Sequence, residues 1–275
     1  MVKSISFEFI FPCLIFAALL INNPLNAQNL KKVKGFRPGK IENVAVDRLG
    51  DFFLVFGNGT IKKYDANGKV LASLKGNKSP TLIEPWYHPR IFKYDYRDRT
   101  CIIYDRNFQN GDVQPLDPSI AIDPILVCPT NDNQLIVLDR ADFSIKRVNP
   151  ASQEVTAEFY IDTVGARLNV TYLREYQNLI FLLDKNHGII IYNKEGKKIN
   201  RLRTNANNFG FFGEELYFLQ HEKIIFFDLY TEKTRELRIA DSKFILVSDE
   251  RILLVDSHDQ VSIFEFSTEK LPDSN

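Results

Sequence analysis

Few residues of this chain have side chains suited to acid–base or metal chemistry, and those few stand in predicted turns. Imidazole is a common metal ligand and the usual proton carrier near neutral pH. The four histidines are His88, His187, His221 and His258. Glu222 and Asp259 stand beside two of them, as a catalytic or metal site would require. Solvated loop histidines are the plainer interpretation, because Asp and Glu are common in any turn.

The segment SPTLIEPWYHPR, residues 79–90, contains the only tryptophan of the chain and three prolines. Proline lowers the entropy of the free loop. Trp86 and Tyr87 offer stacking surface, and Arg90 offers a planar fork of donors. We predict that Trp86, Tyr87, His88 and Arg90 bind a sugar, a peptide or a partner protein. The plainer interpretation, which we favour for Trp86 itself, is that its side chain folds inward and plugs the gap between the first two repeats.

Basic residues follow three of the predicted second strands, namely Arg106, Arg140 and Lys185. Together with Arg90 they could form a basic arc that attracts a carboxylate or a phosphate. The plainer interpretation is again that these basic side chains are scattered over the surface and solvated. The sequence contains no Gly-x-Ser-x-Gly, His-Glu-x-x-His or Cys-x-x-Cys motif and no phosphate-cradling glycine-rich loop, so it points to no familiar catalytic machinery.

A sequence repeat positions these residues: short apolar runs separated by turns return six times, with a period of roughly 40 residues. The first unit runs from Val44 to Leu74, and its hairpins are marked by Asn58-Gly59 and Asn67-Gly68. The other units are 124–161, 168–203, 210–239, 243–266 and a second unit from Ile91, whose first two strands we place in 91–105.

Polarity changes in the same way along each unit. The second strands read FFLVF, CIIY, LIVL, LIFLL, LYFL and ILLV, and unbroken apolar runs indicate burial on both faces. Last strands such as 198–203 and 233–239 mix Lys and Arg with apolar residues. Such charges keep an exposed edge strand from pairing with other chains. This gradient favours radial blades over a two-sheet sandwich. We therefore predict an all-β fold, a six-bladed β-propeller of four-stranded antiparallel blades.

The N-terminal segment supplies the strand that the last unit lacks. The sixth unit ends after three strands, whereas residues 30–36 resemble the outer strand of the first unit. We predict that this segment pairs with the C-terminal blade and closes the ring. If strands alternate in direction within each blade, the loops after second strands and the connections between blades share one face, the upper face. All four histidines and the basic arc are assigned to this face, where we take them, with Trp86 and Tyr87, as candidate residues for binding a ligand or a partner.

Four aspartates, Asp105, Asp139, Asp184 and Asp256, each end a predicted second strand. With their flanking residues, VLDRADFSIKRV and LVDSHDQVSIF resemble the NHL-type repeats of TolB-like six-bladed β-propellers. The resemblance covers nearly all of the chain beyond residue 27. It implies an architecture but no particular activity, because such propellers host enzymes, receptors and scaffolds. We expect the aspartates to accept backbone N–H groups in the turns that follow them.

Residues 1–27 have the pattern of a secretory signal peptide, with Lys3, an apolar run from Phe9 to Ile21, and a small residue at Ala27. That run is shorter than the roughly 20 residues that span a bilayer. Residues 28–275 are long enough for one propeller domain. There, Cys101 and Cys128 are interpreted as buried free thiols, with a disulfide as the alternative.

Basic and acidic residues balance at 35 each, so bulk charge gives no support for nucleic-acid binding. We expect a periplasmic or secreted monomer that does not span the membrane after cleavage and needs no cofactor. The favoured function is a non-enzymatic platform that binds a protein or cell-envelope component through its upper face. The alternative, from the resemblance, is a hydrolase or lyase that acts on a sugar or lactone in a central pocket of the upper face.

Overall fold

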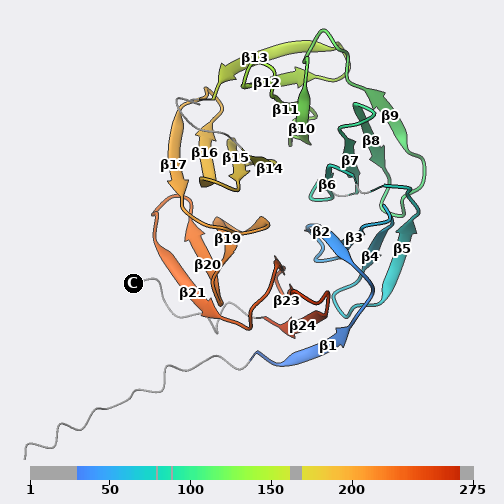
Figure 1. Cartoon of the computed structure of the whole chain (residues 1–275), viewed down its shortest axis with the longest axis vertical. Helices are drawn as coiled ribbons and strands as arrows, with labels where there is room; N and C mark the ends of the chain where they lie inside the picture. The colour runs from blue at the N-terminus through green and yellow to red at the C-terminus, as the bar shows by residue number, and fades with distance from the viewer. Residues whose placement is uncertain (1–29, 79, 88, 162–168, 267–275) are drawn as a thin grey trace, which may run out of the picture.

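The computed structural model describes residues 30–266 except 79, 88 and 162–168. Within these residues, six four-stranded antiparallel sheets stand as blades around a common hub (Figure 1). In each sheet the strands are ordered from the hub to the perimeter. The predicted six-bladed all-β propeller is therefore confirmed. The predicted leader, residues 1–27, lies outside the described residues.

The strands are grouped here by their place in blades 1 to 6. The first strands lie at the hub and are β2 (Ile41–Val46), β6 (Leu82–Glu84), β10 (Pro124–Pro129), β14 (Val170–Tyr176), β18 (Phe209–Phe212) and β22 (Phe244–Val247). The second strands are β3 (Phe52–Phe56), β7 (Ile91–Asp95), β11 (Leu135–Asp139), β15 (Leu179–Asp184), β19 (Glu215–Gln220) and β23 (Arg251–Val255). The third strands are β4 (Ile61–Tyr64), β8 (Thr100–Tyr104), β12 (Ser144–Asn149), β16 (Gly188–Asn193), β20 (Lys223–Asp228) and β24 (Val261–Glu265). The fourth strands, at the perimeter, are β5 (Val70–Leu74), β9 (Asp112–Pro115), β13 (Glu154–Tyr160), β17 (Lys198–Leu202), β21 (Thr234–Arg238) and β1 (Lys32–Phe36).

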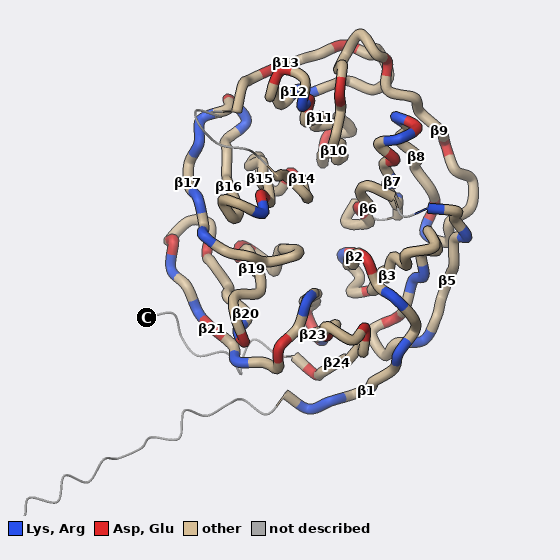
Figure 2. The backbone as a smooth tube through the Cα atoms, in the orientation of Figure 1, with Lys and Arg blue, Asp and Glu red and all other residues tan. Residues whose placement is uncertain are grey.

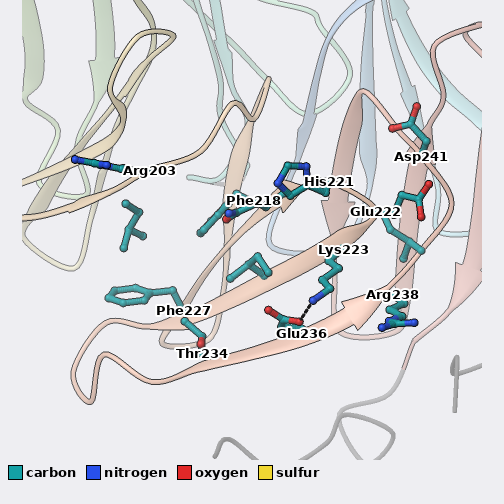
Figure 3. A pocket seen from close by; sticks show the side chains of 14 residues that line it. Arg203, Phe218, His221, Glu222, Lys223, Phe227, Thr234, Glu236, Arg238 and Asp241 are labelled. Atoms are coloured by element: carbon teal, nitrogen blue, oxygen red, sulfur yellow. Dashed lines mark hydrogen bonds and ion pairs between the residues drawn. The ribbon is translucent and has the colours of Figure 1, made fainter. Parts of the chain in front are cut away.

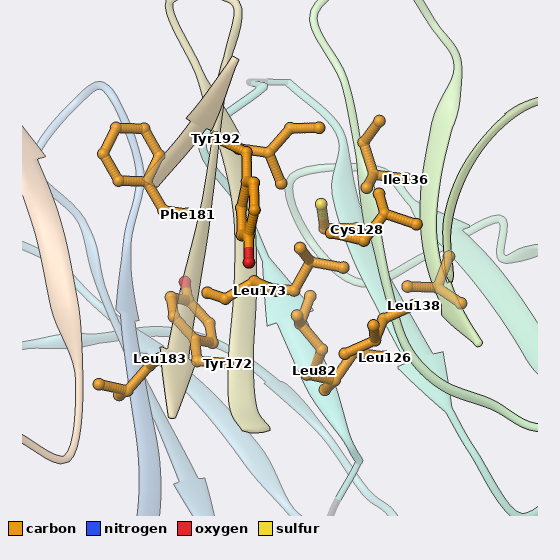
Figure 4. Packing of buried hydrophobic residues seen from close by; sticks show 14 of the residues in the cluster. Leu82, Leu126, Cys128, Ile136, Leu138, Tyr172, Leu173, Phe181, Leu183 and Tyr192 are labelled. Atoms are coloured by element: carbon orange, nitrogen blue, oxygen red, sulfur yellow. The ribbon is translucent and has the colours of Figure 1, made fainter. Parts of the chain in front are cut away.

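Burial falls from the hub to the perimeter, as the repeat predicted. Every residue of β3 and of β11 is buried, because each blade is sandwiched between two others. Figure 4 shows this packing where Leu82, Leu126 and Tyr172 meet from the first strands of blades 2, 3 and 4. The outer strands are mostly exposed, with Lys and Arg along β1 and β17 and Glu along β13 (Figure 2). Strand β5 departs from the charged-edge pattern, since its sequence is VLASL.

Strand β1 closes the ring, as predicted, by pairing antiparallel with β24 of the last blade. Its register places Phe36 opposite Val261 and Lys32 opposite Phe264, with an irregularity after Lys32. The backbone N–H of Glu265 also donates to the carbonyl of Lys31 at 2.9 Å. The two ends of the described chain therefore belong to one sheet, and that sheet has no missing strand.

Blade 2 corrects the sequence analysis. Its first strand is the three-residue β6, so Ile91–Asp95 and Thr100–Tyr104 are the second and third strands rather than the first and second. The CIIY segment accordingly lies in a third strand, and its burial is only partial. Asp105 follows that third strand, and Asp95 takes the equivalent position at the end of the second strand. Loops of blade 2 that the sequence analysis assigned to the upper face therefore lie on the lower face.

The turn role predicted for the aspartates is confirmed. One carboxylate oxygen of Asp256 accepts the backbone N–H groups of His258 and Gln260, at 2.8 and 2.9 Å. Asp105, Asp139 and Asp184 each accept from the residue two positions ahead. The thiol prediction is also confirmed, because Cys101 and Cys128 are both free and buried. Burial raises the pKa of Cys101 to about 12, so its thiol stays protonated and inert near neutral pH.

Candidate functional site

The predicted site residues divide between two faces. The upper face holds the loops between second and third strands and the connections between blades; the lower face holds the loops between first and second and between third and fourth strands. Arg140, His187, His221 and His258 lie on the upper face, as predicted. Trp86, Tyr87 and Arg90 lie on the lower face, in the β6–β7 loop, and Arg106 lies there after β8. His88 lies outside the described residues. The predicted basic arc is therefore wrong, because its members do not share a face.

On the upper face, the polar residues near the hub are used to join neighbouring blades. Arg140 Nε donates to Asp123 Oδ2 at 2.7 Å, and the Tyr96 hydroxyl donates to the other oxygen of Asp123 at 2.8 Å. Lys185 Nζ bonds the carbonyl of Ala206 at 2.9 Å and the side chain of Asn207 at 2.8 Å. The side chains of Arg140 and Lys185 are therefore engaged in hydrogen bonds that link neighbouring blades, and they are not free to bind an anion.

The three described histidines lie in three different blades. His187 Nδ1 is 2.8 Å from Asp184 Oδ1, within its own turn. His258 is exposed, and its carbonyl accepts from the Arg37 guanidinium at 2.8 Å. Among residues 30–266 with the three gaps given above, no group of three or more His, Cys, Asp or Glu side chains is placed to hold a metal ion. The geometry therefore gives the metal interpretation no support.

His221 borders a large open cleft of about 950 Å³ between blades 4 and 5 (Figure 3). Its rim alternates in charge, with Arg203 on blade 4 and Glu222, Arg238 and Asp241 on blade 5. Lys223 and Glu236 also face this cleft, and they form an ion pair with each other. Since the charges balance and lie at the solvent-exposed rim, the cleft carries no strong preference for a ligand of one sign.

The Trp86–Arg90 loop reaches the lower end of the hub. The Trp86 ring packs edge-on against Tyr176 of blade 4, with 6.0 Å between ring centroids. The Tyr87 hydroxyl donates to Glu175 Oε2 at 3.0 Å, also in blade 4. Trp86 does fold inward, but the predicted plug between blades 1 and 2 is wrong. The loop can reach blade 4 because β6 and β14 both end at the lower face.

A buried charge cluster lies beneath this loop. Arg174 Nε is 3.0 Å from Glu84 Oε2, and the two side chains are 5% and 2% exposed. The other oxygen of Glu84 accepts the backbone N–H of Trp86 at 2.9 Å. The hydroxyl of Tyr172 lies 3.5 Å from Glu84 Oε2, and Glu175 Oε1 accepts from the backbone of Asn178 at 3.0 Å. Glu84 and Arg174 thus pair between β6 and β14, while Nη2 of Arg174 has no hydrogen-bond acceptor among the described residues.

Burial controls the proton affinities of the cluster. It raises the pKa of Glu84, and the attraction of Arg174 only partly offsets this rise. Burial acts to lower the pKa of Arg174, but the Glu84 carboxylate and the neighbouring tyrosines together outweigh burial, so the pKa of Arg174 is raised as well. Burial also raises the pKa of Tyr217 to about 12. Gly210 is required here, because a Cβ at this position would lie 2.2 Å from the Tyr217 hydroxyl oxygen.

A more enclosed pocket opens beside Tyr87 on the lower face, between blades 2 and 3. Its volume is about 360 Å³, within the range of ligand sites. Apolar side chains of Phe92, Ile103 and Leu135 line it. Arg90 stands at its exposed rim and donates to Asn133 Oδ1 at 3.0 Å. Further polar rim residues are Gln114, Asp132, Gln134 and Asn149. We call this cavity the blade 2–3 pocket.

Sequence reasoning missed Glu84, Arg174 and Glu175. It drew its candidates from turns and loops and singled out no residue of a first strand, whereas these strands carry the buried charges of the hub. A signal was present, because the Arg174-Glu175 pair interrupts an otherwise apolar and aromatic strand. Charged residues are almost never fully buried unless they are paired. The partner of Arg174 could not be found from the sequence, since Glu84 is 90 residues away and belongs to another blade.

Comparison with known proteins identifies the fold but no family. No protein-family model matches the chain, and no curated protein matches it. Many solved structures do match it. The Pan2 WD40 domain of Neurospora crassa is 8% identical, with a TM-score of 0.60 over 88% of this chain and 96% of that one. Virginiamycin B lyase from Staphylococcus aureus, solved with quinupristin, is 14% identical, with a TM-score of 0.51 over 82% and 80% of the two chains.

The extracellular domain of a one-component system from B. thetaiotaomicron is also similar. It is 14% identical, with a TM-score of 0.53 over 82% of this chain and 33% of that one. At such identities these similarities show the propeller architecture alone. The NHL-type assignment therefore stays a prediction. Within the described residues, no helix has the length and apolarity that a membrane crossing requires.

Proposed function

We propose that this propeller is a non-enzymatic binding platform, and that it captures a protein or cell-envelope component on its lower face. The blade 2–3 pocket is the observation that carries the proposal. It combines apolar walls with a polar rim, the pattern of a site that takes one anchoring side chain and fixes the groups around it. Trp86, Tyr87 and Arg90 retain the binding role predicted for them, now on the face opposite to the one expected.

The charge cluster of the hub favours binding over catalysis. A general acid or base must reach the substrate proton, whereas Glu84 and Glu175 are buried and hydrogen-bonded within the protein. A hydrolase or lyase in the upper-face hub would need free polar groups there. Two of the polar residues at that end are already bonded, Arg140 to the Tyr96 hydroxyl of blade 2 and Lys185 to the carbonyl of Ala206 before blade 5. We further propose that the protein acts as an exported, periplasmic or secreted, monomer.

The test is co-isolation of the partner from the envelope fraction of the source cell. We expect Arg90→Glu to lower recovery of the partner at least tenfold, because it reverses the charge at the pocket rim and an interfacial Arg often carries much of the binding energy. Arg97→Glu is the matched control, since Arg97 is exposed in the same blade but in the loop on the upper face. Loss of the partner with the control, and not with Arg90→Glu, would contradict the proposal.

A further inference from the structure

The blade 2–3 pocket is lined by three side-chain amides whose oxygen atoms are already engaged by the protein. The three amides are those of Asn133, Gln134 and Asn149. A guanidinium nitrogen of Arg90 donates to the first and one of Arg147 to the second, each at 3.0 Å. The backbone N–H of Ala151 donates to the third at 2.9 Å. Guanidinium and backbone N–H groups can only donate, so they fix which end of each amide is oxygen and which is nitrogen.

The nitrogen ends of the same amides remain for a ligand. Among the described residues, none of the three NH2 groups donates to a protein acceptor, and each NH2 group carries two donors. Free acceptors are fewer. Gln114 Nε2 donates to Asp112 Oδ2 at 3.0 Å, which leaves the amide oxygen of Gln114, and the Tyr87 hydroxyl can accept while it donates to Glu175. Donors without a partner therefore exceed acceptors at this pocket.

The charges at the pocket favour a neutral ligand. Two carboxylates line it, and each is paired with a guanidinium group: Glu84 with Arg174 at 3.0 Å, and Asp132 with Arg147 at 2.8 Å. Arg90 is the one guanidinium group in the lining, and it donates to a neutral amide. An anion would meet both carboxylates, and a cation would find each of them already paired. The donors that remain free are uncharged.

The rest of the lining is largely apolar, with Phe92, Ile103, Leu135 and two prolines. A fitting ligand therefore combines an apolar face with several neutral acceptors. A pyranose ring has both, because its C–H groups form a face and its hydroxyls surround the ring. Each hydroxyl rotates to donate and has two lone pairs to accept with. Each peptide unit, in contrast, brings an N–H that needs an acceptor of its own. The excess of donors thus favours a sugar over a peptide.

We propose that the blade 2–3 pocket binds one neutral sugar ring of an envelope glycan. This inference rests on the proposed function and names the component captured, with the ring in the place of an anchoring side chain. Hydroxyls of the ring accept from the NH2 groups of Asn133, Gln134 and Asn149. One hydroxyl donates to the amide oxygen of Gln114, and the C–H face packs on Phe92. The volume of about 360 Å³ accommodates one ring with its substituents.

The experiment is saturation-transfer NMR of the purified protein with the methyl glycosides of glucose, galactose, mannose and N-acetylglucosamine. Cyclohexylmethanol keeps the six-membered ring without the ring hydroxyls, and N-acetylphenylalanine amide offers a neutral peptide anchor. We expect saturable binding of at least one glycoside, with a Kd of about 1 mM or tighter, and none of the other two probes. Failure of all four glycosides, or equal binding by either of the other probes, overturns the proposal.

A pair of isosteric variants ties the binding to the free donors. Asn149→Asp keeps the oxygen that accepts from Ala151 and replaces the NH2 group by an acceptor, so we expect it to weaken glycoside binding about tenfold. Asn193→Asp is the matched control. Asn193 likewise ends the third strand of its blade and accepts backbone N–H groups of Glu195 and Lys197, but it lies outside the pocket. Equal binding by the two variants would overturn the donor role and with it the proposal.

The result is separable from the test of the proposed function. Recovery of an envelope partner that depends on Arg90, together with no binding of any glycoside, would retain the lower-face platform and reject the sugar. Binding of a glycoside that Asn149→Asp weakens, together with no partner that depends on Arg90, would retain the sugar site and reject the platform.

Discussion

Removing residues 28–36 lowers the melting temperature by about 10 °C or more in our account. The change deletes β1 and leaves β24 with an open edge in the last blade. It also removes Phe36, which packs against the buried cluster shared by blades 1 and 6. Net hydrogen bonds contribute about 1 kcal/mol each and a buried aromatic side chain about 2 kcal/mol. For a domain of this size each kcal/mol corresponds to about 2–4 °C.

Thermal unfolding followed by circular dichroism gives the shift directly. A chain that starts at Leu30 is the matched control, because it keeps all of β1 together with the packing of Leu30 on the neighbouring cluster. A synthetic peptide of residues 28–36, added in trans, should restore part of the lost stability by pairing with β24. A shift below about 3 °C for the deletion would show that the ring does not depend on this strand.

Replacing Arg174 by Met should destabilise the fold by about 3–5 kcal/mol, since it leaves Glu84 buried without its counter-charge. The double variant Glu84→Gln with Arg174→Met should recover much of this loss, because a buried ion pair contributes little more than neutral groups of similar shape. Chemical unfolding in urea measures both differences. If the double variant were as unstable as the single variant, packing around Arg174 rather than charge would be responsible.

The same pair of variants has a defined pH dependence. Burial already raises the pKa of Glu84, and Arg174 is the charge that opposes this rise. Without Arg174 the pKa of Glu84 rises further in the folded state, so the folded single variant takes up a proton more readily than the unfolded chain. The free energy of unfolding of the single variant should therefore fall furthest below that of the double variant near pH 8. This stability deficit should shrink towards pH 5. A deficit that grows on acidification would contradict this assignment.

The architecture was predictable because its signals are local. Unbroken apolar runs such as those of β3 and β11 recur with the repeat, and hairpin residues such as Asn58-Gly59 separate them. The turn aspartates were interpretable for the same reason, since Asp256 bonds backbone groups only two and four residues ahead. The closing strand β1 was predictable because the last unit lacked one outer strand and the N-terminal segment resembles such a strand.

Blade 2 was misassigned because its first strand has almost no pattern. Strand β6 is only three residues long and lies between Pro80 and Pro85. Ile91–Asp95 is a stronger apolar run, so the pattern alone predicts it as the first strand. This single shift placed the Trp86–Arg90 loop and Arg106 on the wrong face. The strand is short because the chain turns at Pro85 and continues across the lower end of the hub.

The candidate sites could not be predicted further, because they arise from contacts between blades. Trp86 meets Tyr176 and Arg174 from blade 4, and Arg48 from blade 1. No spacing in the sequence relates these residues, whose proximity follows only from the circular order of the sheets. The three described histidines illustrate the converse, since each lies on the upper face as predicted, but in a different blade and not in one common site.

Site-specific photo-crosslinking in the native envelope tests most directly whether the lower face is the binding face. A photoreactive residue is placed at Ala151, an exposed residue of the blade 2–3 pocket, or at Ser257, an exposed residue of the upper face. The account predicts one discrete adduct from position 151, lost when Arg90→Glu is added, and no adduct from position 257. A discrete adduct from position 257 alone would contradict the account.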